Sequence, residues 1–221
     1  MKKNQIIDIP AIGEIINRQM RERKNVLVRE IESFSWGTYE ECVNIFSNIF
    51  VRVDSSITRY YLLKEYQEVI NWMTDTKGKG LLLMGDCGRG KTIIISSVIP
   101  VLFGMKNRTL RPFLAQDMNR DLGRVYPNLN PPRALSCLEY LLDCHYPVID
   151  ELGSEPLYND YGEKCEGFNL VINAAERYNR PMFITTNLTE DQILSRYGER
   201  TLDRLVHLCL TVKFSGQSLR K

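Results

Sequence analysis

The sequence has 221 residues, a length that suits one α/β domain with a short appendage and excludes two full domains. Hydrophobic residues make up 43% and charged residues 25%, the balance of a soluble globular protein, which excludes wholesale disorder. The formal net charge of +2 lacks the strong basic excess of many nucleic-acid-binding proteins, so any contact with DNA requires a local basic patch.

Cysteine spacing and hydropathy predict a cytoplasmic protein without a membrane partner. The six cysteines are scattered, and no pair has the C-x₂-C spacing of a zinc site or a redox motif. We therefore expect reduced thiols. The first residues lack the continuous apolar segment of a signal peptide, and the longest apolar runs, such as Ile93 to Phe103, are too short to span a bilayer.

The first part of the chain predicts helices. An amphipathic pattern, with arginines between its apolar positions, is formed by Ile12, Ile15, Ile16, Met20 and Leu27. Ser33 to Gly37 breaks this pattern, and further helices are expected over Tyr39–Phe50 and Tyr60–Met73. We interpret residues 1–58 as a helical N-terminal extension and residues 59–221 as the main domain. The amphipathic segment around Ile12 to Leu27 is expected either to dock on a partner as a helix in a groove or to pack on its own main domain.

From Gly80 onward, strand and helix patterns alternate. The expected strands are Gly80–Met84, Arg111–Gln116, His145–Asp150, Met182–Thr186 and Leu208–Phe214. The expected helices are Thr92–Phe103, Leu135–Cys144, Phe168–Tyr178, Asp191–Tyr197 and Thr201–His207. This alternation predicts an α/β fold with a mainly parallel five-stranded sheet flanked by helices.

A phosphate-binding loop is predicted directly after the first strand. The segment GDCGRGKT fits the pattern G-x-x-x-x-G-K-[ST] without a gap. Its glycines let successive backbone amides point at phosphate oxygens, and the following helix directs its positive end at the same anion. Lys91 is expected to reach the β- and γ-phosphates, and the Thr92 hydroxyl to ligate Mg²⁺. The predicted nucleotide contacts are Gly85, Asp86, Cys87, Gly88, Arg89, Gly90, Lys91, Thr92 and Ile93. ATP and Mg²⁺ are therefore the expected ligands.

Two adjacent carboxylates, Asp150 and Glu151, end the strand at 145–150. Parallel sheets place their ligands at the carboxyl ends of strands, so this pair is expected beside the phosphate loop. Asp150 is predicted to hold the Mg²⁺ shell, and Glu151 to deprotonate the water that attacks the γ-phosphate.

Polar residues also end the next strand, in the segment PMFITTN. Asn187 is expected to position the attacking water, although a simple helix-capping role fits the same residue types. Further along, Arg200 and Arg204 are four residues apart and share one helix face. They either pair with Glu199 and Asp203 on the surface, or one of them reaches the γ-phosphate bound by a neighbouring subunit.

The order GDCGRGKT, PVIDELGSE, FITTN, RYGERTLDRL and FSGQSLR resembles that of the DnaC/DnaI-like helicase loaders, AAA+ type P-loop ATPases, and their relatives the IstB-like transposition ATPases. The resemblance covers residues 60–221 and implies an AAA+ domain that self-associates through its ATP site. By position, Asn187 corresponds to sensor 1, Arg204 to the likelier arginine finger with Arg200 second, and Arg220 to sensor 2 in the same subunit.

The sequence departs from that family pattern at two positions. Glu151 stands where these loaders commonly have a second aspartate, and glutamate is a competent activator of water. Arg89 is unusual inside a phosphate loop, and we expect it either to be solvated or to face a partner subunit.

The resemblance implies a DNA-replication ATPase that binds a replicative helicase and helps place it on single-stranded DNA. Local candidates for DNA contact are Arg120, Arg124 and Arg133, with Tyr126 available for base stacking, although a solvated loop is an alternative. Two other functions are consistent with the same motifs. One is a transposition helper that binds duplex DNA and recruits a transposase, and the other is a nucleotide-gated adaptor with negligible turnover.

Overall fold

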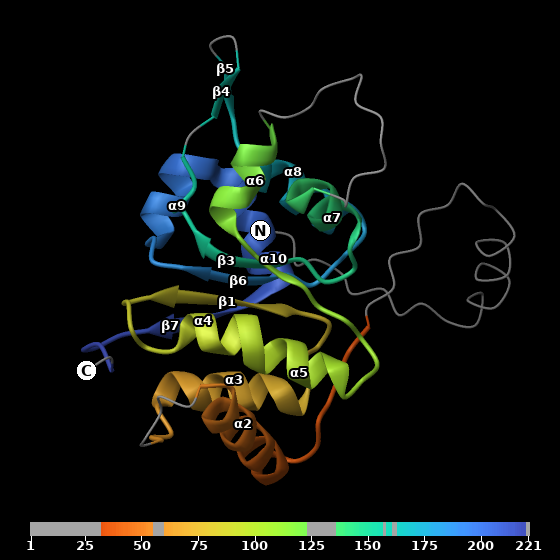
Figure 1. Cartoon of the computed structure of the whole chain (residues 1–221), viewed down its shortest axis with the longest axis vertical. Coiled ribbons are helices and arrows are strands. Elements are labelled where there is room, and N and C mark those ends of the chain that lie inside the picture. The colour runs from red at the N-terminus through yellow and green to blue at the C-terminus, as the bar shows by residue number, and fades with distance from the viewer. Residues whose placement is uncertain (1–31, 55–59, 123–135, 157, 161–162, 220–221) are drawn as a thin grey trace, which may run out of the picture. The chain divides into compact units, whose positions relative to one another are not determined.

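Five parallel strands form the central sheet in the computed structural model, which describes residues 32–54, 60–122, 136–156, 158–160 and 163–219 (Figure 1). They are β1 (Gly80–Gly85), β2 (Pro112–Leu114), β3 (Val148–Leu152), β6 (Phe183–Thr186) and β7 (Cys209–Phe214). Their order across the sheet is β2-β3-β6-β1-β7, and every neighbouring pair is parallel. The predicted five-stranded parallel sheet is confirmed.

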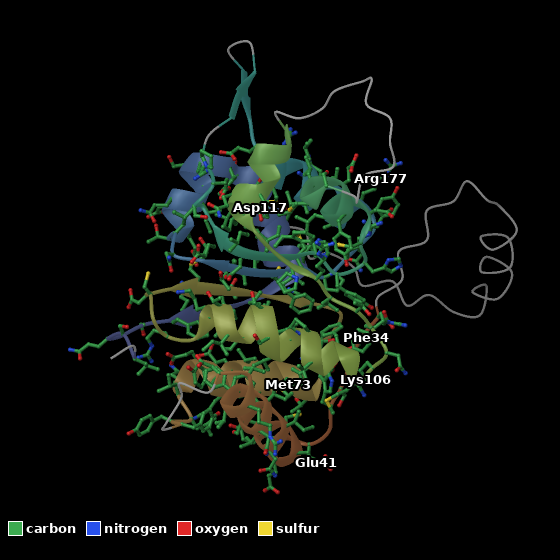
Figure 2. All side chains as sticks on the ribbon, in the orientation of Figure 1. Phe34, Glu41, Met73, Lys106, Asp117 and Arg177 are labelled. Carbon is green, nitrogen blue, oxygen red and sulfur yellow. The ribbon has the colours of Figure 1, made fainter. Side chains whose placement is uncertain are left out.

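Helices cover both faces of this sheet (Figure 1). On one face lie α3 (Lys64–Thr74) and the helix that follows the phosphate loop, and α2 (Tyr39–Val53) packs against these two helices. The other face packs against α6 (Ala115–Leu122), α7 (Cys137–Asp143), α8 (Gly167–Arg177), α9 (Glu190–Tyr197) and α10 (Glu199–Leu208). In Figure 2, Met73 lies on the first side of the sheet, and Asp117 and Arg177 lie on the second.

The buried strands lack an alternating pattern because both of their sides face helices. Leu81, Leu82 and Leu83 of β1 are all at most 1% exposed, and successive side chains enter opposite cores. This continuous apolar run places the glycine-rich loop directly at the carboxyl edge of the sheet.

Helix α2 belongs to the same core as the phosphate-loop helix, although the sequence predicted it as part of the N-terminal extension. Thr38 and Glu41 form a capping box at its start. Phe46 and Phe50 are buried, and their rings lie 5.6 Å and 5.1 Å from the ring of Tyr66 on α3. The described residues all fall in one unit, residues 31–221, and α2 belongs to that unit.

The helix after the phosphate loop is not uniform. It consists of α4 (Lys91–Ile93), a π-helical turn η1 (Ile94–Val98) and α5 (Ile99–Gly104). Pro100 lies in the first turn of α5 and has no N–H to donate to the carbonyl of Ser96. A wider turn relieves this mismatch, and π-turns within helices often occur at functional sites.

A two-stranded antiparallel ribbon, β4 (Tyr158–Asp160) and β5 (Glu163–Cys165), follows β3 and was not predicted. Several predicted contacts lie outside the described residues. These are the docking segment from Ile12 to Leu27, the DNA candidates Arg124, Tyr126 and Arg133, the side chain of Arg120, and the sensor Arg220. In the part of the chain that the structure describes, no helix is long and apolar enough to cross a membrane.

Candidate nucleotide-binding site

The phosphate loop connects β1 to α4 at the carboxyl edge of the sheet, as the sequence predicted. At two positions in this loop, close contacts leave no room for a side chain and therefore require glycine. Gly85 has a φ of +123°, and a Cβ there would lie 2.1 Å from the backbone oxygen of Phe214 on β7. Gly90 has a φ of +85°, and its Cβ would lie 2.7 Å from the hydroxyl of Tyr66. A side chain at either position would therefore displace the loop.

Lys91 is directed into the loop. It is 7% exposed, and its Nζ donates to the backbone oxygens of Gly85, at 2.7 Å, and Asp86, at 2.6 Å. It also donates to Oδ1 of Asn187, at 3.0 Å, from the loop after β6. The structure thus brings together the predicted phosphate lysine and the predicted sensor, which are 96 residues apart in the sequence.

Asp150 lies at the centre of a hydroxyl cluster and is 4% exposed. Its Oδ1 accepts from the hydroxyl of Thr92 at 3.2 Å and from the hydroxyl of Thr185. Its Oδ2 lies 3.5 Å from the Ser96 hydroxyl on the π-helical turn. Thr185 and Ser96 were missed as site residues. The position of Thr185 at the polar end of a buried strand could have identified it as a site residue. Ser96 reaches Asp150 only because of the geometry of the π-helical turn, which the sequence did not predict.

Glu151, the predicted activator of water, lies in the turn that ends β3. It is exposed, whereas Asp150 before it is buried. Its φ is +59°, a left-handed conformation that is uncommon for a non-glycine residue, and its backbone N–H donates to the Thr185 hydroxyl at 2.9 Å. The pairing of β3 with β6 shifts register between Ile149 and Leu152. This irregularity turns Glu151 out of the sheet at the edge that carries Lys91.

The oxygens of Thr92 and Asp150 suit a hard cation such as Mg²⁺. Among the described residues, no group of three or more histidine, cysteine, aspartate or glutamate side chains is placed to hold a metal. Mg²⁺ binds through few protein ligands when phosphate and water oxygens complete its shell, so a threonine with one aspartate fits that chemistry.

Arg89 forms a buried ion pair with α3, in contrast to both sequence expectations. The residue is 9% exposed, and its Nε donates to Oε1 of Glu65 at 2.8 Å. Its Nη1 donates to the backbone oxygen of Gln217 at 3.2 Å. The backbone oxygen of Arg89 accepts from the Tyr66 hydroxyl at 3.0 Å. Arg89 is therefore not solvated, and it connects the phosphate loop to α3 and to the chain after β7.

Breaking this pair on one side is expected to destabilise the domain. Arg89→Met leaves the Glu65 carboxylate buried without its partner, and we expect the free energy of unfolding to fall by about 3 kcal/mol in urea denaturation. The double variant with Glu65→Gln should recover most of that loss. Glu68→Gln, one turn along α3, is the control and should change stability by less than about 0.5 kcal/mol. Equal losses in the single and double variants would contradict the pairing.

The segment after β7 lies against the phosphate loop. The backbone N–H of Gly216 donates to Oδ2 of Asp86, and that of Leu219 donates to the backbone oxygen of Gly88, both at 2.9 Å. A Cβ on Gly88 would lie 2.1 Å from the hydroxyl oxygen of Ser218. The residue that follows this contact is Arg220, the predicted sensor 2.

The two candidate finger arginines differ in their surroundings. Arg200 is exposed at the start of α10, whereas Arg204 is half-buried and its Nη1 donates to Oδ1 of Asn173 on α8. The sequence offered surface ion pairs with Glu199 and Asp203 as an alternative. Among the described residues, neither Arg200 nor Arg204 forms such a pair.

The fold is similar to that of several solved structures. One similar structure is titled as that of DnaI, with a TM-score of 0.54, 18% identity, and coverage of 75% of this chain and 93% of that one. Another is titled as the DnaC helicase loader, with a TM-score of 0.55, 19% identity, and coverage of 72% of this chain and 95% of that one. The chain therefore shares the fold of these structures of DnaI and DnaC.

A third solved structure, a putative primosome component from Streptococcus pyogenes serotype M3, has a TM-score of 0.49 and 16% identity, and covers 80% of this chain and 81% of that one. No protein-family model matches this sequence, and no curated protein matches it. The resemblance to DnaC and DnaI was predicted from five short motifs. The solved structures of DnaI and DnaC confirm it at the level of the fold, whereas the comparisons with family models and curated proteins find no match.

Proposed function

We propose that this chain is a Mg²⁺-dependent ATPase that loads a replicative helicase onto single-stranded DNA. The observation that carries the proposal is the convergence of three sequence-distant motifs at one edge of the sheet. Lys91 donates to Asn187 at 3.0 Å, and Thr92 donates to Asp150 at 3.2 Å. These contacts support a single site for the predicted phosphate, metal and sensor residues. The solved structure with this fold that is titled as a helicase loader supports the cellular role.

In the proposed reaction, Lys91 exchanges its backbone acceptors for oxygens of the β- and γ-phosphates. Thr92 and Asp150 hold Mg²⁺, which when bound neutralises charge on the phosphates. Glu151 accepts a proton from the attacking water, and Asn187 orients that water. The burial of Asp150 among hydroxyl donors keeps its carboxylate fixed, while the exposure of Glu151 leaves it accessible to water.

The proposal includes assembly of several copies around the ATP sites. Arg204, with Arg200 as the second candidate, supplies a charge to the γ-phosphate bound by a neighbouring subunit. Arg204 is held in place by Asn173, and an arginine finger benefits from such ordering before it engages phosphate. Arg220 serves as sensor 2 for its own subunit, since Leu219 before it is already bonded to the phosphate loop.

Partner contact is assigned to the amphipathic segment from Ile12 to Leu27, which docks as a helix in a groove of the helicase. Contact with single-stranded DNA is assigned to Arg120, Arg124 and Arg133 through phosphates, with Tyr126 stacking on a base. A protein with this role works in the cytoplasm.

A pull-down of the cognate replicative helicase tests the proposal. We expect the wild-type protein to retain the helicase in the presence of ATP and Mg²⁺, and Lys91→Ala to lose nucleotide-dependent retention. Ile15→Asp with Ile16→Asp should lose the helicase while keeping ATP affinity, which separates partner docking from nucleotide binding.

Failure to retain the helicase, with ATP binding intact, would overturn the loader function. Preference for duplex DNA and filament formation on long DNA would then indicate the IstB-like transposition helper. Retained ATP affinity without phosphate release, even beside DNA and partner, would instead indicate a nucleotide-gated adaptor.

A further inference from the structure

The turn after β3 holds the backbone around Glu151 in an unusual conformation. Glu151 and Gly153 both have positive φ, +59° and +101°. Such conformations persist only where the surrounding structure holds them, and they often occur at active sites. The side chain of Glu151 is exposed, and its backbone N–H donates to the Thr185 hydroxyl at 2.9 Å. Residues 153–155 of the turn are held by further contacts.

Arg196 of α9 supplies those contacts. Its Nη1 donates to the backbone oxygen of Gly153 at 2.8 Å, and its Nη2 donates to that of Glu155 at 2.7 Å. Its Nε donates to Oε1 of Glu166, just before α8, at 3.1 Å. The guanidinium thus joins three segments of the chain, with only 19% of the side chain exposed. Planar, rigidly spaced donors make arginine suited to this task.

Glu155 completes the network from inside the turn. Its side chain is fully buried, and its carboxylate accepts from the backbone N–H of Gly153 at 2.8 Å and from the hydroxyl of Tyr197. Burial and the neighbouring Glu155 carboxylate raise the pKa of the Tyr197 phenol, so the phenol remains a hydrogen-bond donor at neutral pH. Tyr197 and Arg196, which are adjacent on α9, therefore hold the same turn.

The same turn contacts the loop that carries the predicted sensor. A Cβ on Gly153 would lie 2.6 Å from Cδ1 of Leu188, which follows Asn187. The Thr186 hydroxyl donates to the backbone oxygen of Leu152 at 2.7 Å. Movement of α9 relative to the turn would therefore affect Glu151 and Asn187 together.

We propose that Arg196, acting through Glu155 and the 152–155 turn, positions Glu151 for hydrolysis in its own subunit and is not an arginine finger. The proposal rests on the proposed ATPase function. The hydrogen bonds of Arg196 and Tyr197 go to the 153–155 part of the turn and to Glu166, outside the phosphate loop, so this role predicts a larger effect on hydrolysis than on ATP affinity. Arg196 is thus assigned a role in the same subunit, within the motif that also contains Arg200 and Arg204.

Steady-state ATP hydrolysis and the binding of a fluorescent ATP analogue separate positioning from binding. Arg196→Lys keeps the charge but cannot span three acceptors, and we expect kcat to fall by about 10-fold to 100-fold, since small misplacement of a catalytic group has effects of that size. The dissociation constant for the analogue should change by less than about 2-fold. Tyr197→Phe, which removes one hydroxyl, should lower kcat less, and the exposed Ser195→Ala on the same helix is the control.

Mixing variants separates action in one subunit from action between subunits. Lys91→Ala subunits have an intact finger and should restore hydrolysis to Arg204→Ala subunits, whose own sites are complete. They should not restore it to Arg196→Lys subunits, whose own sites are misaligned. Restoration of Arg196→Lys by mixing, or a loss of ATP affinity as large as the loss of kcat, would overturn the proposal.

Amide hydrogen exchange distinguishes failure of this proposal from failure of the proposed function. The N–H of Gly153 should exchange at least about 10-fold faster in Arg196→Lys than in the wild type, because its bond to Glu155 is no longer held. If the wild-type protein does not hydrolyse ATP, the ATPase function is refuted. The exchange rate of the Gly153 N–H would then still test whether Arg196 holds the turn. Unchanged exchange at Gly153 would overturn that role.

Discussion

Replacement of Lys91 by alanine is expected to weaken ATP binding by about 100-fold or more. Its ammonium group is the main point charge in the loop, and each hydrogen bond to a charged phosphate contributes about 1.5–3 kcal/mol. Titration with a fluorescent ATP analogue in the presence of Mg²⁺ measures the change. Because Lys91 is buried among backbone carbonyls, a thermal melt should accompany each titration to establish that the variant is folded.

Lys213→Ala is the matched control for this experiment. Lys213 lies on β7, its side chain is 69% exposed, and its Nζ forms an ion pair with Glu190 at 2.9 Å. Surface pairs of this kind contribute little to stability, and this lysine is not part of the loop. Its removal should leave ATP affinity unchanged. Equal affinities for Lys91→Ala and wild type would show that the loop does not bind phosphate.

Glu151→Gln is expected to lower kcat for ATP hydrolysis by about 100-fold to 10,000-fold, while ATP affinity stays within about 2-fold of wild type. Loss of a general base has effects of this size, and glutamine keeps the shape of the side chain but does not accept a proton from water. Single-turnover phosphate release, measured beside equilibrium binding, separates the two quantities. The protein should then hold its partner in the ATP-bound form.

Asp191→Asn serves as the control for Glu151→Gln, because Asp191 is an exposed carboxylate in the first turn of α9. It should hydrolyse ATP at the wild-type rate. If Glu151→Gln hydrolyses ATP at the normal rate, another group must accept the proton from water. Asp150 and Glu151 would then not have the separate roles proposed for them.

Most of the strands were predictable because their signals are local. A buried parallel strand requires a continuous apolar run, and runs at 80–84 and 182–186 are bounded by glycine or polar residues. The predicted strand over Arg111–Gln116 was too long, because Ala115 begins α6, and this helix was not predicted. The continuous helix predicted over Thr92–Phe103 instead contains a π-helical turn before Pro100.

The site residues were predictable to the extent that they belong to a motif. Lys91 and Thr92 were selected from the phosphate-loop pattern, and Asp150 and Asn187 from their positions at strand ends. The structure brings these residues within hydrogen-bonding distance of one another in pairs. Ser96 was missed because a lone hydroxyl carries no spacing pattern, and Thr185 was missed because only Asn187 was selected from the polar end of its strand. The roles of all these residues in catalysis remain predictions.

The sequence by itself determined the five strands of the sheet, the phosphate-loop motif and the adjacent acids Asp150 and Glu151, because each depends on residues adjacent in the chain. The tertiary structure alone decided where the charged side chains go. Arg89 and Glu65 are 24 residues apart, and Arg196 and Glu155 are 41 apart, so neither pair leaves a periodic signal. A buried charge requires a partner, but which partner is nearest depends on how the sheet and helices pack.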